Sequence, residues 1–145
     1  MQIQTLRLIT ALFVIIFIML YVHTNSEQRF YSKTAEPAVT QIFKDISDWQ
    51  KASLLRHLAP EAKETITDEQ LNQLLDRYRE FGWFYGVNEI NFSRTASVFS
   101  LFGDKHINYS GTADYSTGAV RFNITLVKRG KYFLVYNFSL ARVAD

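Results

Sequence analysis

The chain has 145 residues, a formal net charge of +2 and no cysteine. The lack of cysteine excludes disulfide bonds, cysteine-ligated zinc and a thiol nucleophile. Charges of both signs are mixed without a basic cluster, so the electrostatic signature of a nucleic-acid-binding protein is absent.

The N-terminus carries the most apolar stretch of the chain. Between Leu8 and Val22 the only polar residue is Thr10. A helix over Leu6–Val22 is about 25 Å long at 1.5 Å per residue, which is the short end of what crosses a bilayer. Apolar residues lie all round this helix, and this disfavours a buried helix of a soluble domain.

Two interpretations of this segment compete, a cleaved signal peptide and an uncleaved membrane anchor. The residues after the apolar run contain no small-x-small cleavage motif, and this favours an anchor over residues 1–23. Positive charges are nearly balanced across it, with Arg7 before the run and Arg29 and Lys33 after it. The very short N-terminal tail favours the cytoplasmic side for that end, and hence the opposite side for the rest of the chain.

The remainder divides into a tether and one domain. Residues 24–34 are polar and unpatterned, so the sequence predicts a tether there. Residues 35–145 have the size of a single domain. Its first helix is predicted from about Ala35 to Ile46, with Pro37 in the first turn. The apolar stripe of this helix consists of Val39, Ile42, Phe43 and Ile46.

Two further helices are predicted. Ser47 to Gln50 has the form of a capping box and begins a short helix that Pro60 ends. Thr67 to Gln70 repeats the start signal, and Gly82 is placed to cap the end of the third helix. The apolar face of the third helix consists of Leu71, Leu74, Leu75, Tyr78 and Phe81.

After Gly86 the apolar residues recur at every second position, as in strands with one buried face. Four strands are predicted, around residues 90–98, 107–115, 120–126 and 132–140. Tight turns are predicted at Gly103-Asp104, Thr117-Gly118 and Arg129-Gly130. The sequence therefore predicts an α+β fold in which three helices pack on a four-stranded antiparallel sheet.

This order of elements resembles the NTF2-like (cystatin-like) superfamily over about residues 35–143. The resemblance rests also on the region from Trp49 to Glu61 and on Tyr78–Gly82 leading into the sheet. It implies that the helices lie in the concavity of a curved sheet. Bacterial members with one N-terminal anchor are similar to periplasmic scaffold, accessory or immunity-type proteins, whereas other members are small enzymes.

Catalytic members of the superfamily use a pocket between helices and sheet, usually with a carboxylate or a His–Asp pair. The predicted inward face of this sheet contains no Asp, Glu or His. The three histidines, His23, His57 and His106, are isolated from one another in the sequence. Acidic residues around Thr67 are explained by helix capping. We therefore predict no catalytic residue, no metal site and no cofactor.

Tyrosines on the predicted core face are candidates for a ligand pocket. A buried hydroxyl needs a hydrogen-bond partner, and a small hydrophobic ligand or lipid is one occupant that fits such a lining. The alternative is that these side chains only fill the core. The candidate pocket residues are Tyr78, Tyr109, Tyr115, Tyr132 and Tyr136.

Two surfaces are candidates for contact with a protein partner or a second copy of the chain. The first is the predicted outer face of the sheet, which consists of Arg121, Asn123, Phe133, Val135 and Asn137. The second is the aromatic segment between two glycines, which consists of Trp83, Phe84 and Tyr85 and is either core or an exposed patch.

The sequence thus favours a single-pass inner-membrane protein whose periplasmic domain binds a protein partner in an envelope complex and is not an enzyme. The alternatives are a domain that binds a hydrophobic ligand or lipid and, less favoured, a small NTF2-like enzyme.

Overall fold

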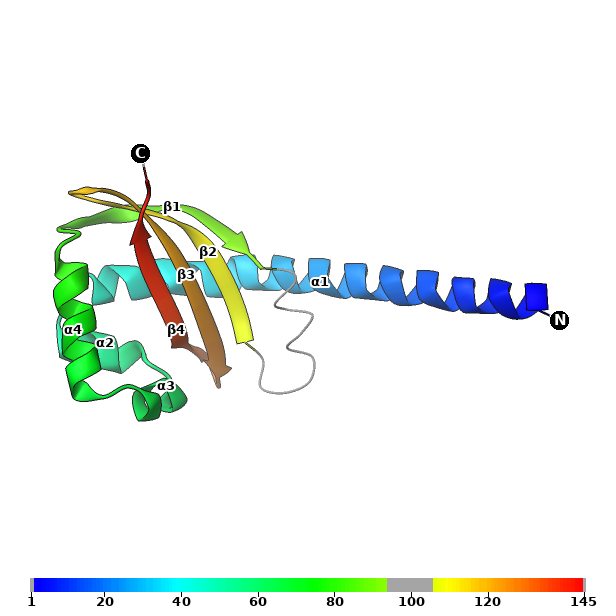
Figure 1. Cartoon of the computed structure of the whole chain (residues 1–145), viewed down its shortest axis with the longest axis horizontal. Coiled ribbons are helices and arrows are strands. Elements are labelled where there is room, and N and C mark those ends of the chain that lie inside the picture. The colour runs from blue at the N-terminus through cyan, green and yellow to red at the C-terminus, as the bar shows by residue number, and fades with distance from the viewer. Residues whose placement is uncertain (1, 94–105, 145) are drawn as a thin grey trace.

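The structure, a computed structural model, describes residues 2–93 and 106–144, apart from the side chains of Thr24, Glu27 and Gln28. The helices are α1 (Gln2–Ile46), α2 (Lys51–His57), α3 (Pro60–Thr65) and α4 (Asp68–Arg79). The strands are β1 (Phe84–Phe92), β2 (His106–Tyr115), β3 (Gly118–Arg129) and β4 (Tyr132–Arg142) (Figure 1). The strands form one open antiparallel sheet in the order β1-β2-β3-β4, which confirms the predicted α+β fold.

One continuous helix joins the apolar N-terminus to the domain. α1 is 45 residues long and includes residues 24–34, so the segment predicted as a tether is helical. The hydroxyls of Ser32 and Thr34 donate to the carbonyls of Arg29 and Phe30, three and four residues earlier. Polar side chains that bond to their own helix in this way do not interrupt it. The N-terminal half of α1 extends away from the sheet as a rod (Figure 1).

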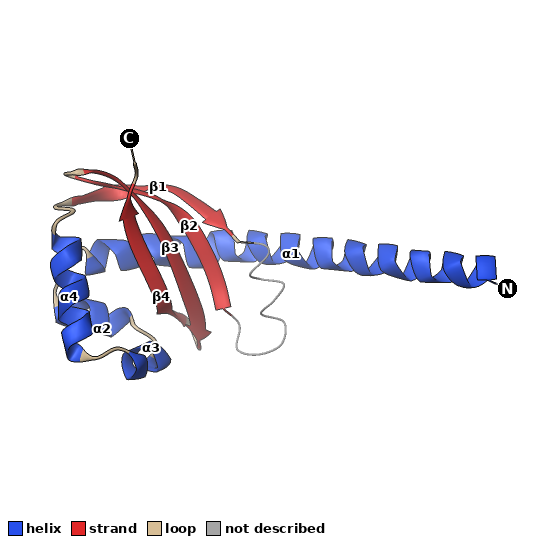
Figure 2. Ribbon diagram, in the orientation of Figure 1, coloured by secondary structure: helices blue, strands red, loops and turns tan. Residues whose placement is uncertain are grey.

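The core lies between α1 and the sheet. Figure 2 shows α1 running behind the curved strands, with α2, α3 and α4 gathered at one end. The inward stripe of α1 consists of Tyr31, Ala35, Val39, Ile42, Phe43 and Ile46, all of them buried. Phe43 packs on Phe122 of β3, with ring centroids 4.7 Å apart. The predicted stripe from Val39 to Ile46 is therefore correct, and it continues about two helical turns further back, through Ala35 to Tyr31.

A bulge in β4 changes which side chains of that strand point toward the core, and this differs from the prediction. Thr125 of β3 pairs with Asn137, but the next residue, Leu126, pairs with Val135, so Tyr136 is the extra residue. A one-residue bulge shifts the strand by one position. Each side chain beyond the bulge then points to the opposite face of the sheet from the one that strict alternation predicts. Val135 is consequently fully buried and Tyr136 is 42% exposed.

Of the two predicted capping boxes, one forms and the other does not. Thr67 forms the predicted capping box with Gln70, and both of its hydrogen bonds are present. The box predicted at Ser47 does not form, because the chain turns at Trp49 with a φ of 53° and α2 begins only after Gln50. Instead, Asp48 accepts a hydrogen bond from the Gln50 amide at 2.9 Å.

Two other boundaries differ from the prediction. Pro60 is the first residue of the short helix α3, where a missing amide hydrogen costs nothing, and α2 already ends at His57. β1 begins at Phe84, earlier than the predicted strand. The remainder of that predicted strand, including Ala96 and Val98, and the predicted turn at Gly103-Asp104 lie outside the described residues.

Candidate functional site

The N-terminal half of α1 has the properties of a membrane anchor. The segment Gln2–His23 is long and apolar enough to cross a bilayer, and none of it is buried against the rest of the chain. Phe13 and Ile15 are 58% and 52% exposed. Thr10, the polar exception, donates its hydroxyl to the carbonyl of Leu6 at 2.9 Å, so its polar group is satisfied within the helix, as a lipid environment requires.

Three of the five candidate pocket tyrosines lie in the packed core. Tyr78, Tyr109 and Tyr115 are at most 4% exposed. The Tyr78 hydroxyl accepts a hydrogen bond from the Leu140 amide at 3.2 Å, and the Tyr115 hydroxyl is 3.1 Å from Ser47 Oγ. The Tyr109 hydroxyl is buried and has no hydrogen-bond partner within the part of the chain that is described.

The other two tyrosines do not belong to this group. Tyr132 and Tyr136 are 75% and 42% exposed, because the β4 bulge turns them to the opposite face, so their predicted inward orientation is wrong. Tyr136 packs its ring against His106 at a centroid distance of 4.5 Å. The five tyrosines therefore do not line one common pocket.

Burial also determines the protonation of the core tyrosines. It raises the pKa of Tyr115 to about 12, against the effect of the hydrogen bond to Ser47. Burial raises the pKa of Tyr109 as well, and the negative charge of Glu36 adds to this effect. These hydroxyls stay neutral at physiological pH, and none of them is poised to act as a base.

Glu36 is a carboxylate in the first turn of the predicted domain helix, and sequence reasoning assigned it no role. It lies on the described helix α1, is half-buried, and burial raises its pKa. Its charge acts on Tyr109 of β2, and this proximity of residues far apart in the chain is not indicated by any periodicity of the sequence. The described residues contain no group of three or more His, Asp or Glu side chains arranged to hold a metal ion.

The outer face of the sheet differs from the predicted contact surface. Arg121, Asn123 and Asn137 are exposed there, as expected for polar residues in this phase. Phe133 and Val135 lie on the inner side instead: Val135 is fully buried, and Phe133 contacts the ring of Tyr31 at 6.4 Å. The apolar part of the predicted surface is therefore absent, and what remains is polar.

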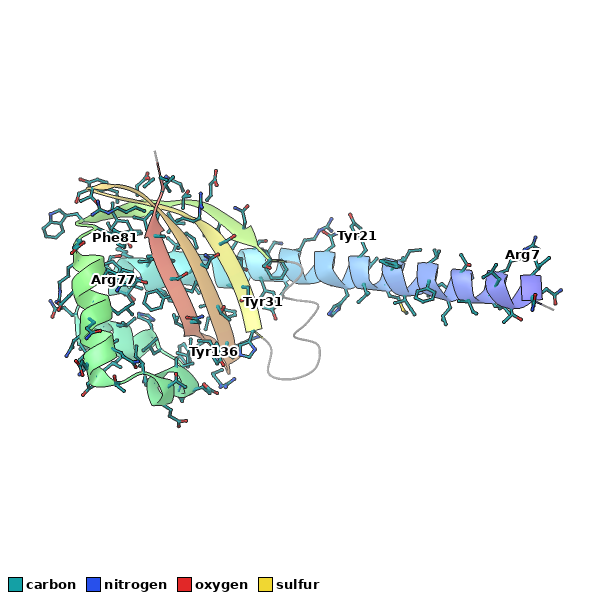
Figure 3. All side chains as sticks on the ribbon, viewed as in Figure 1. Arg7, Tyr21, Tyr31, Arg77, Phe81 and Tyr136 are labelled. Atoms are coloured by element: carbon teal, nitrogen blue, oxygen red, sulfur yellow. The ribbon has the colours of Figure 1, made fainter. Side chains whose placement is uncertain are left out.

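The aromatic segment after α4 is divided between core and surface. Phe84 is half-buried and packs on Tyr115 at 5.5 Å. Trp83 and Tyr85 are 80% and 72% exposed. In Figure 1 this connection lies at the end of the domain opposite the N-terminus, and Figure 3 shows the nearby Phe81 far from Arg7 and Tyr21. We call Trp83 and Tyr85 the distal aromatic pair.

The backbone beneath the distal aromatic pair is fixed by the β2–β3 turn. The Trp83 amide donates to Ser116 Oγ at 2.9 Å, and the Ser116 amide donates back to the Trp83 carbonyl at 2.8 Å. Gly82 takes a φ of +82° next to this contact, a conformation that favours glycine. The two exposed rings are thus presented from a braced loop.

A groove of about 610 Å³ lies between α1, the end of α2 and the β3–β4 hairpin. Its lining consists of Thr34, Ala38, Gln41, Ile42, Arg56, His57, Arg129, Lys131, Tyr132, Phe133 and Leu134. Sequence reasoning missed this site, because its residues come from three separate elements and the hairpin residues were assigned to other roles.

Comparisons with known proteins give no relative for this chain: no protein-family model, curated protein or solved structure matches it.

Proposed function

We propose that this protein is a membrane-anchored binding or scaffold domain. The N-terminal half of α1 holds it in the inner membrane and the rest of the chain lies in the periplasm, where it binds a protein partner in an envelope complex. We also propose that the domain is a member of the NTF2-like superfamily, on the strength of helices packed on an open, curved antiparallel sheet.

The exposure of the distal aromatic pair carries the proposal for a protein partner. Trp83 and Tyr85 are 80% and 72% exposed. Trp and Tyr are enriched among the residues that dominate protein–protein binding energy. The loop is braced by Ser116, so little conformational entropy is lost when a partner covers it.

The geometry of α1 suits this role. From His23 to Ile46 the helix rises roughly 35 Å, at about 1.5 Å per residue. α1 is continuous, so it acts as a spacer and holds the distal aromatic pair away from the bilayer at a defined height. A partner bound there would be a soluble protein or the projecting domain of another membrane protein.

Photo-crosslinking in intact cells tests the proposal. A photoreactive amino acid in place of Tyr85 should give a discrete crosslinked species, and the same residue in place of Arg121, on the polar outer face, should not. The double substitution Trp83→Ala and Tyr85→Ala should lower recovery of that partner at least tenfold, while thermal unfolding of the full chain stays unchanged. Partner recovery that survives the double substitution would refute the distal aromatic pair as the contact.

A further inference from the structure

The groove between α1, α2 and the β3–β4 hairpin combines an apolar lining with a positive rim. Its volume of about 610 Å³ is within the range of small-molecule sites. Apolar side chains from both sides form its lining, namely Ala38 and Ile42 from α1 and Phe133 and Leu134 from β4. An occupant must therefore carry a substantial apolar part.

The polar residues of the lining include three cations and one histidine. Arg56, His57, Arg129 and Lys131 line the groove, and no Asp or Glu does. Two of these four already have acidic partners: His57 Nε2 is 3.0 Å from Asp45 Oδ2, and Arg129 pairs with Glu61.

Arg56 and Lys131 are the two cations of the lining that remain available to contact a ligand. Both are exposed, and neither forms an ion pair within residues 2–93 and 106–144. One comes from the last turn of α2 and the other from the β3–β4 turn, so they border the groove from different elements. An anionic group between them would satisfy both without disturbing the two existing pairs.

The position of the groove along α1 indicates the membrane as the source of such a molecule. Thr34, which lines the groove, follows His23 by eleven residues on the same helix, a rise of about 17 Å at 1.5 Å per residue. If Gln2–His23 spans the bilayer, the groove stands close to the bilayer surface, where amphiphiles with one acyl chain exchange with the aqueous phase.

We infer that this groove binds an amphiphile with a single acyl chain and an anionic head, either a carboxylate or a phosphate. The chain lies against Ala38, Ile42 and Phe133, and the head contacts Arg56 and Lys131. This site is separate from the distal aromatic pair, so it adds a ligand to the proposed protein-binding function and does not depend on the partner.

Photo-crosslinking with a diazirine-labelled palmitate tests the inference on the full chain in nanodiscs of zwitterionic lipid. Mass spectrometry should locate crosslinks at residues 34–42 and 131–134. Unlabelled oleate and oleoyl lysophosphatidate should both compete, and comparing them identifies whether carboxylate or phosphate is preferred. Oleyl alcohol and an oleyl trimethylammonium salt should not compete.

Two variants complete the test. Arg56→Gln with Lys131→Gln should reduce crosslinking at the groove at least about tenfold, since two charge-assisted contacts are lost. The matched control, Lys63→Gln with Arg121→Gln, removes the same charge from exposed positions elsewhere and should have no effect. Ala38→Trp fills the groove and should abolish crosslinking while the cations remain.

Crosslinks confined to residues 2–23, or equal competition by oleyl alcohol, would overturn the inference, since they would show only partitioning into lipid or binding without regard to charge. Recovery of the partner by the groove variants is expected to be normal, so a failure of this inference is distinguishable from a failure of the proposed function.

Discussion

The two halves of α1 differ in how their side chains are buried. In the N-terminal half, Phe13, Ile15 and their apolar neighbours are exposed on all sides of the helix, and none of the segment is buried against the rest of the described chain. In the C-terminal half, one stripe from Tyr31 to Ile46 is buried against the sheet while the other faces carry polar residues. Both halves belong to one α-helix, so the difference in burial follows from the pattern of the side chains.

This difference teaches that the stability of the two halves has separate origins. The domain half is held by packing, and a cavity there costs unfolding free energy. In the proposed function, the N-terminal half is held by transfer into lipid, and a charge there costs insertion free energy. Substitutions that affect one half should leave the other unchanged.

The largest effect is expected from Phe43→Ala in the domain half. Phe43 is fully buried against Phe122, so its truncation should lower the free energy of unfolding by about 3–5 kcal/mol. Chemical denaturation of the full chain in detergent, followed by tyrosine and tryptophan fluorescence, measures this. The matched control, Phe13→Ala in the other half, should leave the midpoint unchanged. Equal losses for both variants would mean that the N-terminal half packs on the domain.

A charge in the N-terminal half should weaken membrane insertion and leave the stability of the domain unchanged. Ile15→Arg places a cation near the centre of the apolar segment, where insertion costs about 2.5–3.5 kcal/mol. The fraction of protein that resists alkaline carbonate extraction should fall, while the denaturation midpoint of the domain stays constant. Ile15→Leu is the neutral control. Full retention of the arginine variant in the membrane fraction would argue against a spanning segment.

The smallest effect concerns the end of the buried half of α1, and it is confined to alkaline pH. Tyr115, which contacts Ser47 directly after α1, has a pKa raised to about 12 in the fold, whereas an unfolded tyrosine titrates near 10. The fold therefore favours the neutral hydroxyl, and its contribution to stability is complete below pH 10 and is lost as the pH rises to about 12.

Denaturation midpoints measured from pH 8 to 12 test this sign. Tyr115→Phe should reduce the alkaline loss of stability, with a neutral-pH cost of about 1 kcal/mol from the missing hydrogen bond. Tyr85→Phe, at an exposed ring, should leave the pH profile unchanged. An unaltered profile for Tyr115→Phe would show that other groups produce the alkaline loss.

The bulge in β4 explains why part of the candidate site was not predictable. The segment from Tyr132 to Leu140 carries apolar side chains in both phases, so alternation alone does not say which set points inward. The pairing with β3 decides it, by omitting Tyr136 from the register. The exchange moved Val135 from the predicted partner surface into the core and Tyr132 from the predicted pocket to the surface.

The sequence by itself determined the features that depend on local pattern. It identified the apolar N-terminus, the amphipathic stripe of α1, the capping box at Thr67 and the two-layer α+β class, because side-chain period and capping chemistry act over a few residues. The tertiary structure alone decided that the anchor and the first domain helix are one rod, that Trp83 and Tyr85 face solvent, and that three elements enclose a basic-rimmed groove. These features depend on register and on contacts between residues far apart in the chain, which no local pattern encodes.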